Sequence, residues 1–251
     1  MVATTKDEVI DFVFPEGEIN NHQFFCGRAI LTILNEQSMS VNNKVLQRIK
    51  GDEVVLKSVT EQVEMGDIEQ ATMSVEDLEL ETPTGMPPHH LVVKVGAPLI
   101  LLRNLNLKGG LCNGTRMVIK KIIRDNNGRV VTLLCENITP LKHTGEMVAI
   151  PRIKLKYENK ENCVCFMRTQ FPVRLGFSMT VNKSKGQTLN KVGLIFDTPP
   201  FSHGQLYVAL SRVRSIQDIK MYAPRKGPMT YGKDHQRVYT TKNIVYREIL
   251  S

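Results

Sequence analysis

The most constraining feature of this chain is a pair of polar segments, residues 177–189 and 203–212, that flank a short apolar run at 192–196. The apolar run is bounded by polar residues and proline, a pattern typical of a buried β-strand. The first segment gathers hydroxyls, amides, two lysines and Gly186. Glycine lets a backbone approach a phosphate, while lysine, threonine and glutamine donate hydrogen bonds to it. Residues 177–189 are therefore a candidate phosphate-contacting segment.

The second polar segment has helical spacing and ends in one arginine. Leu206, Ala209 and Leu210 are expected to share an apolar face against a sheet, and Arg212 follows them. Because an unpaired buried guanidinium is costly, we expect Arg212 to project, partly exposed, into a cleft where it awaits a phosphate. We also expect folding to be nearly independent of this residue.

Charge points to a polyanionic partner. The net charge is +8, but residues 52–81 hold ten acidic residues and one basic residue, which leaves 32 basic and 15 acidic residues elsewhere. A solvated surface with one acidic loop is the plainer interpretation, and a polyanion-binding face is the better one. No export signal is evident and the five cysteines are an odd number, so we expect an intracellular chain with reduced thiols.

The first third of the chain predicts a parallel sheet. Residues 28–34 form an apolar run, residues 35–50 have an apolar stripe of helical period, and residues 53–58 read as a second strand. This β-α-β order favours parallel strands with a right-handed crossover. Thr32 and Asn35 lie at the carboxyl end of the first strand, where such sheets bind ligands. A strand end and a helix cap are equally good roles for them. Residues 1–27 read as the tail of a preceding domain.

The middle of the chain predicts a small β-barrel. After a strand-like run at 91–102 and a turn at Asn113-Gly114, short strands recur at 117–123, 130–135, 146–150 and 164–167. This spacing is typical of an antiparallel barrel, here expected at 117–171 as an insertion into an α/β domain made of 28–116 and 172–251. A short helix is expected at 75–80. Basic residues that could line a nucleic-acid groove or remain solvated are Lys120, Lys121, Arg124, Arg129, Lys142, Arg152, Lys154 and Lys156.

Five runs of sequence resemble the PIF-type DNA helicases, including the Helitron group, which are RecD-like enzymes of superfamily one. Residues 95–106 read VGAPLILLRNLN and residues 111–116 read LCNGTR; residues 180–189 and 204–212, TVNKSKGQTL and GQLYVALSR, are similar to the family's fifth and sixth motifs. Residues 29–35 are similar to its fourth motif. The resemblance implies an α/β fold: a RecA-like second helicase domain with a parallel sheet, carrying an SH3-like β-barrel as an insertion.

The resemblance also implies roles for individual residues. Arg212 would be the catalytic arginine that reaches the γ-phosphate of ATP, and Gly186 and Gln187 would border the same nucleotide. The family usually has His at the position of Asn182 and Gln at that of Lys185, so the role of Lys185 is open. Contacts with single-stranded DNA are predicted for Thr32, Asn35, Asn113, Thr180, Asn182, Lys183 and Ser184.

The chain has no clear ATP-binding loop of its own. A phosphate-cradling loop reads G-x-x-x-x-G-K-[ST], and the near match at 227–233 is followed by Asp234 instead of Ser or Thr. No apolar strand ends in Asp-Glu to hold Mg²⁺. We therefore expect ATP and Mg²⁺ to bind only in a complete helicase, with an N-terminal RecA-like domain as partner. A non-catalytic nucleic-acid-binding relic is the alternative. The resemblance implies a nuclear or mitochondrial location, and it does not choose among DNA repair, recombination, telomere maintenance and transposition.

Overall fold

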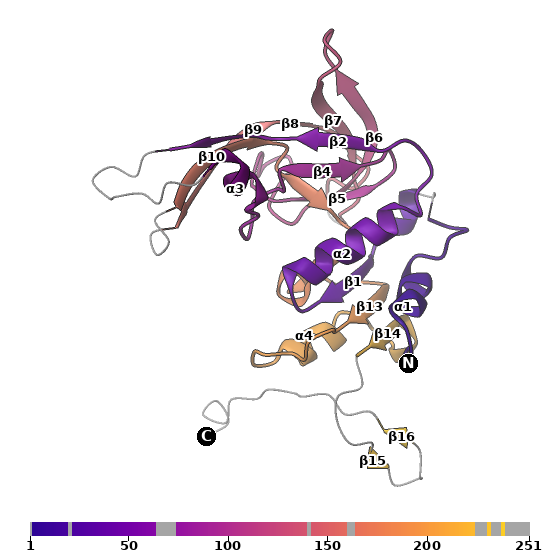
Figure 1. Cartoon of the computed structure of the whole chain (residues 1–251). Helices are drawn as coiled ribbons and strands as arrows, with labels where there is room; N and C mark the ends of the chain where they lie inside the picture. Colours follow the sequence, from indigo (N-terminus) through magenta and orange to yellow (C-terminus); the bar gives the residue numbers. More distant parts are fainter. Residues whose placement is uncertain are drawn as a thin grey trace. The chain divides into compact units, whose positions relative to one another are not determined.

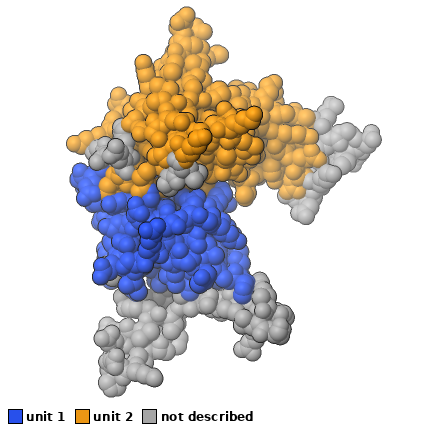
Figure 2. Space-filling view, turned by 180° about the vertical axis from the view of Figure 1, so that it is seen from behind, with its two compact units in different colours: residues 1–19, 27–48, 177–251 blue, residues 20–26, 49–176 orange. Residues whose placement is uncertain are grey.

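The computed structural model describes residues 2–19, 22–63, 74–139, 142–159, 164–223, 230–231 and 237–238. The chain divides into two compact units, one of residues 1–19, 27–48 and 177–251 and the other of residues 20–26 and 49–176. Figure 1 labels the elements and Figure 2 colours the two units. The near match to a phosphate loop at 227–233 lies largely outside the described residues, as does the cysteine at 163.

Unit 1 contains a four-stranded parallel sheet in the order β12-β1-β13-β14. The strands are β1 (Arg28–Thr32), β12 (Ser178–Thr180), β13 (Lys191–Ile195) and β14 (Ile219–Tyr222). The first three are almost wholly buried, as expected of parallel strands, which read as continuous apolar runs. The predicted strands at 28–34 and 192–196 are confirmed.

Helix α1 (Lys6–Val13) belongs to unit 1 and packs on β13 and β14 (Figure 1). Its residues Val9 and Val13 are fully buried, and a Cβ added to Gly193 would lie 2.5 Å from Val9 Cγ1 and 2.9 Å from Val13 Cγ2. Glycine at 193 therefore lets the helix approach the sheet closely. The interpretation of residues 1–27 as the tail of a preceding domain is wrong for this helix, because the apolar run at 9–14 finds its partner in the sheet far along the chain.

Helix α2 (Asn35–Leu46) follows β1 as predicted, with Val41, Val45 and Leu46 buried; it ends before Ile49, which is buried as well. Its N-cap is Leu34, and Asn35 is its first residue, so the capping role considered for Asn35 is not confirmed. The strand after this helix, β2 (Val54–Lys57), does not join the parallel sheet. It pairs antiparallel with β4 (His90–Val93), and Leu56 is its one buried residue. The predicted β-α-β unit is therefore wrong, since a half-exposed strand suits an antiparallel pair and not a parallel sheet covered on both faces.

Unit 2 contains antiparallel sheets. One has the order β11-β5-β6-β7-β8 and another the order β3-β10-β9. Their strands are β3 (Val59–Gln62), β5 (Pro98–Leu101), β6 (Arg116–Arg124), β7 (Val130–Asn137), β8 (Met147–Pro151), β9 (Ile153–Asn159), β10 (Val164–Gln170) and β11 (Val173–Leu175). The four predicted strands correspond to β6, β7, β8 and β10, and α3 (Val75–Leu80) corresponds to the predicted helix. Closure of these sheets into a barrel stays a prediction.

Two further differences are local. The run at 91–102 is two strands, β4 and β5, because the chain turns at Lys94–Ala97, where the Ala97 N–H donates to the Lys94 carbonyl at 3.1 Å. Strand β9 was missed although its apolar and charged residues alternate, which is the pattern of a half-buried strand.

Residues 49–116 lie in unit 2 and not in unit 1, so the compact units do not follow the predicted boundaries at 116 and 171.

The smaller elements complete the description. They are η1 (His22–Phe25), η2 (Val181–Ser184), α4 (Gln205–Leu210), η3 (Ile216–Asp218), β15 (Thr230–Tyr231) and β16 (Arg237–Val238). None of the helices in the described ranges is long and apolar enough to cross a bilayer. The four cysteines that the structure describes are free thiols.

Candidate nucleotide and nucleic-acid interface

The carboxyl edge of the parallel sheet gathers most of the predicted site residues. Thr32 ends β1 and Thr180 ends β12, and the two residues are direct neighbours across the sheet. The 3-10 helix η2 follows Thr180 at once and carries Asn182, Lys183 and Ser184. Because all four strands run in the same direction, their carboxyl ends share one edge, where open α/β sheets bind ligands. Two segments that are distant in sequence therefore meet at one place.

Arg212 joins the helix α4 to the segment that carries the predicted phosphate contacts. Its Nη1 donates to the Ser184 carbonyl at 3.2 Å and to the Gln187 carbonyl at 3.0 Å, and its Nε donates to the Val208 carbonyl at 2.8 Å. The Leu189 N–H in turn donates to the Arg212 carbonyl at 2.8 Å. The side chain is partly exposed, as expected. The guanidinium is thus paired with backbone carbonyls in the absence of a phosphate. That folding is nearly independent of Arg212 stays a prediction.

Helix α4 packs only in part through the predicted residues: Ala209 is buried as expected, whereas Leu206 and Leu210 are not. Gln205 and Ala209 are buried, whereas Leu210 is 45% exposed and Leu206 is half-buried. The helix has six residues and follows Gly204, which has a φ of 67°. Arg212 lies just beyond the helix, where the chain turns back toward η2.

The loop after η2 leaves backbone accessible at Gly186. This residue has a φ of +77°, and no heavy atom lies within 4 Å of a Cβ placed on it. The left-handed conformation disfavours other residues, so glycine is needed here for its backbone and not for lack of space. Gln187 folds back on the same loop, with Nε2 donating to the Lys183 carbonyl at 3.3 Å. Gly186 therefore gives a phosphate an open approach to the backbone.

The predicted DNA contacts differ in their exposure. Asn35 and Asn182 are exposed and Lys183 is half-buried. Ser184 is fully buried and its hydroxyl donates to the Val181 carbonyl at 2.7 Å, while Thr32 is also fully buried and donates to the Leu34 carbonyl at 3.1 Å. These two hydroxyls shape the backbone of the site, so their prediction as direct contacts has no support in this geometry.

The last two predicted contacts lie in different units. Thr180 is 8% exposed and precedes η2. Asn113 is exposed in unit 2, where its N–H donates to Asn104 Oδ1 at 2.7 Å. The structure therefore brings Thr32, Asn35, Thr180 and the residues of 182–187 together with Arg212, and it places Asn113 in the other unit.

Several of the basic residues in unit 2 are engaged within the protein. Lys120 pairs with Glu136 at 2.6 Å and Lys156 with Glu158 at 2.8 Å. Arg152 donates to the Lys57 carbonyl at 2.7 Å. Lys121, Arg124, Arg129, Lys142 and Lys154 are exposed. The exposed members are the better candidates for a nucleic-acid surface, since a cation already neutralised releases fewer counterions on binding.

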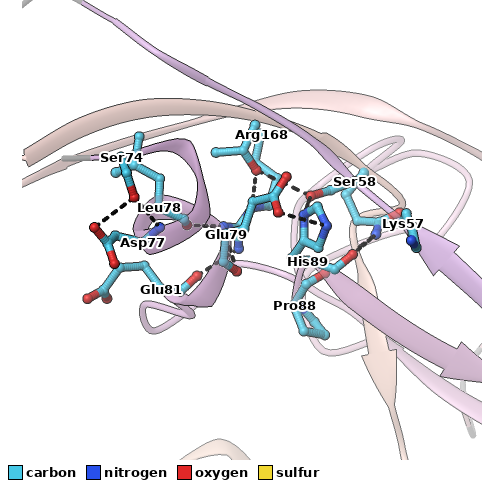
Figure 3. Close-up of polar contacts among 12 residues, drawn as sticks. Lys57, Ser58, Ser74, Asp77, Leu78, Glu79, Glu81, Pro88, His89 and Arg168 are labelled. Carbon is cyan, nitrogen blue, oxygen red and sulfur yellow. Dashed lines mark hydrogen bonds and ion pairs between the residues drawn. The ribbon is translucent and has the colours of Figure 1, made fainter.

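Sequence reasoning missed a buried polar cluster around Arg168 of β10 (Figure 3). This side chain is fully buried. Its Nη2 donates to the Leu78 carbonyl at 2.6 Å, its Nη1 to the carbonyls of Glu81 and Pro87 at 2.8 and 3.1 Å, and its Nε to Thr60 Oγ1 at 3.1 Å. The guanidinium thus caps the carboxyl end of α3 and holds the chain that follows it. A lone arginine in an alternating strand gives no sequence signal for such a role.

His89 extends this cluster. Its Nδ1 lies 2.8 Å from Ser58 Oγ, and its Nε2 lies 3.4 Å from Glu79 Oε2 (Figure 3). Burial lowers the pKa of His89 below its ordinary value, the Glu79 carboxylate opposes this shift, and His90, Arg168 and Lys57 add to it. The neutral imidazole is therefore favoured in the folded protein, where the buried Arg168 guanidinium already carries a positive charge nearby.

The protein should lose stability as the pH falls through the range below about 6.5, the ordinary pKa of histidine. A lowered pKa in the folded state means that the unfolded chain binds the proton first, so the contribution is complete above about 6.5 and is lost as the pH falls toward the folded value. Thermal unfolding followed by circular dichroism between about pH 7.5 and 5.5 measures this loss. The loss should be smaller in His89→Gln and nearly unchanged in His90→Gln, whose side chain is exposed. Equal losses in both variants would contradict the assignment.

Comparison with known proteins relates the chain to one group of helicases. Residues 80–122 match the family model described as DNA helicase Pif1, 2B domain. The chain is 33% identical over 133 residues to the ATP-dependent DNA helicase PIF6 of Trypanosoma brucei brucei, a match that covers 53% of this chain and 16% of the relative. It is 25% identical over 219 residues to the ATP-dependent DNA helicase Pif1 of Campylobacter jejuni, covering 86% of this chain and 45% of the relative.

Solved structures share the fold. The crystal structure of Pif1 helicase from Candida albicans superposes with a TM-score of 0.59 at 23% identity, over 86% of this chain and 53% of that one. Bacteroides Pif1 bound to single-stranded DNA superposes with a TM-score of 0.54 at 20% identity, over 77% of this chain and 40% of that one. The chain thus spans about half or less of the length of each protein it matches. In sequence and in fold, it is related to the Pif1-type DNA helicases.

Proposed function

We propose that this chain is the C-terminal motor half of an ATP-dependent 5′–3′ DNA helicase, which binds single-stranded DNA and supplies an arginine to ATP held by another domain. Unit 1 would be the second RecA-like domain, and the antiparallel strands of unit 2 would form its inserted SH3-like barrel. The observation that carries the proposal is the contact of Arg212 with the carbonyls of Ser184 and Gln187. It joins the two segments most similar to the helicase motifs at the ligand-binding edge of a parallel sheet.

Each group at this edge would have a defined task. Arg212 would stabilise the charge on the transferring phosphoryl group with its planar fork of donors. The open backbone at Gly186, together with Gln187, would border the nucleotide. Asn182 and Lys183 would contact the DNA backbone one turn earlier in the same segment. Because the Ser184 and Gln187 carbonyls bind Arg212, a change at the nucleotide would reach the DNA-binding residues through a few hydrogen bonds.

A nucleotide would contact this chain at the carboxyl edge of the parallel sheet, while another domain would hold it. Gly186 and Arg212 are suited to contact phosphates, and ATP would supply the phosphoryl group that is transferred. Among the described residues, no three His, Cys, Asp or Glu side chains group as metal ligands. Mg²⁺ and the phosphate-cradling loop would be supplied by an N-terminal RecA-like domain of a complete helicase.

Binding of single-stranded DNA tests the first half of the proposal. The chain should bind a fluorescein-labelled oligothymidylate weakly, with an affinity that falls steeply as salt rises, because phosphate contacts release counterions. Fluorescence anisotropy at several salt concentrations measures the slope. An affinity that stays flat between low and physiological salt would contradict a site built on backbone contacts.

Reconstitution separates the motor from its alternative, a non-catalytic nucleic-acid-binding module. The internal hydrogen bonds of Arg212 fit both functions, since they form without any nucleotide. A chimaera that joins this chain to the N-terminal ATPase half of a Pif1 relative should hydrolyse ATP in response to single-stranded DNA, and the chain alone should not exceed background. A folded chimaera that binds DNA and shows no stimulated turnover would favour the non-catalytic module.

A further inference from the structure

Asn42 of α2 occupies the outer edge of the parallel sheet. Strand β12 ends the sheet order, so its outer backbone groups have no neighbouring strand in the part of the chain that the structure describes. The Asn42 side chain takes that place: its Nδ2 donates to the Ser178 carbonyl at 3.1 Å, and the Ser178 N–H donates to its Oδ1 at 2.8 Å. Both residues are buried, at 4% and 0% exposure. The amide thus satisfies two backbone groups that water does not reach.

The surroundings of Asn42 are polar as well. Ser38, one turn earlier on α2, is 1% exposed, and the hydroxyls of Ser38 and Ser178 have no hydrogen-bond partner among the described residues. Apolar residues would be cheaper to bury at such an interface. Apolar side chains, however, tolerate sliding of a strand past a helix, whereas a two-point amide contact holds Ser178 at one position. The arrangement therefore specifies the placement of β12 more than it adds stability.

Placement of β12 determines placement of the candidate DNA contacts. Ser178 is the first residue of β12, and η2 with Asn182 and Lys183 follows the strand without a break. At the other end, α2 begins with the exposed residue Asn35. One helix therefore presents a predicted DNA contact at its start and, two turns later, fixes the strand that carries the others.

We propose that Asn42 is a positioning residue for single-stranded DNA, which holds η2 at a fixed distance from the start of α2 through the backbone of Ser178. This inference rests on the proposed DNA binding. Asn42 itself touches no DNA; it acts by fixing where Asn182 and Lys183 meet the strand. Loss of the Asn42 amide should weaken DNA binding even when the chain still folds and all charges outside α2 are the same.

The substitution Asn42→Asp tests this role, with Asn43→Asp as its control. Asn43 is the next residue of the same helix and is exposed, so both variants add the same charge. At about pH 8 the carboxylate at 42 keeps the acceptor, loses the donor to the Ser178 carbonyl and should weaken oligothymidylate binding about tenfold relative to the control. Burial raises the pKa of such a carboxyl. On acidification toward about pH 5.5 its protonated form can donate as the amide did, and binding should recover relative to the control.

Each outcome decides the question. Equal binding by the two variants at the higher pH, or a loss that persists on acidification, would overturn the role. If Asn42→Asp fails to fold, the uncharged Asn42→Leu replaces it; it should bind weakly at both pH values without recovery, and binding like that of the unchanged chain would overturn the proposal. If the unchanged chain binds no oligothymidylate, the proposed function fails separately. Amide hydrogen exchange of residues 178–184 then tests the contact itself, and exchange no faster in Asn42→Asp than in Asn43→Asp would refute it.

Discussion

In the reconstituted chimaera, Arg212→Lys should lower ATP turnover by on the order of a thousand-fold, with a much smaller change in the affinity for ATP. Loss of an arginine that stabilises the transition state of phosphoryl transfer has an effect of this size. Lysine keeps the positive charge and loses the planar fork, so ground-state attraction survives while the transition-state contact does not. The measurement is steady-state hydrolysis with saturating single-stranded DNA, reported as kcat and KM.

The contacts of Arg212 require a control for folding. Its guanidinium binds the carbonyls of Ser184, Gln187 and Val208, and we expect Arg212→Lys to lower the melting temperature of the chain by a few degrees, since one or two hydrogen bonds are lost. Arg214→Lys is the matched variant, because Arg214 is exposed two residues later and should alter neither property. Turnover that falls only in proportion to the unfolded fraction would make Arg212 a structural residue and refute its catalytic role.

The parallel sheet shows how far sequence patterns reach. Strands β1 and β13 are continuous apolar runs, and such runs predict buried strands whatever their neighbours. The local sequence does not show which strands pair with them. Strand β2 is the next strand after β1, yet β1 pairs with β12 and β13, far along the chain. Periodicity carries no record of which strands meet, so the pairing prediction for residues 53–58 was wrong while the strand itself was right.

The candidate site divides in a similar way. The segments around Gly186 and Arg212 were predicted because they resemble two helicase motifs, and the structure brings them into contact. The side-chain directions of Ser184 and Thr32 were not predictable, since a hydroxyl serves equally well as a ligand contact or as a partner for a nearby carbonyl. Asn42, Arg168 and His89 escaped notice because their partners are backbone carbonyls and side chains from segments that only the fold brings close.

Arg168→Met should destabilise unit 2 by roughly 3–5 kcal/mol, the largest effect on folding expected of any single change considered for this chain. Methionine keeps much of the aliphatic length and removes the guanidinium. The carbonyls of Leu78 and Pro87 would then stay buried without their donor, and the partly buried Glu81 carbonyl would lose its donor as well. Each buried polar group left unsatisfied costs about 1–3 kcal/mol. Arg168→Lys should recover only part of the loss. The single ammonium of lysine has fewer donors than the planar guanidinium and cannot bind the Leu78, Glu81 and Pro87 carbonyls at once.

The location of the damage distinguishes this role from general destabilisation. Arg168 fastens α3 and the residues after it to β10, so amide exchange should rise first in residues 75–93 and leave the parallel sheet of unit 1 protected, as expected when cooperative units open separately. Lys154→Met is the matched control: Lys154 is exposed on β9, opposite Thr169 of β10, and its loss should change unfolding by less than about 0.5 kcal/mol. Urea unfolding followed by circular dichroism gives the free energies of unfolding. If Arg168→Met unfolds at the same urea concentration as Lys154→Met, the buried guanidinium does not hold unit 2 together, and its hydrogen bonds merely offset the cost of burying the charge.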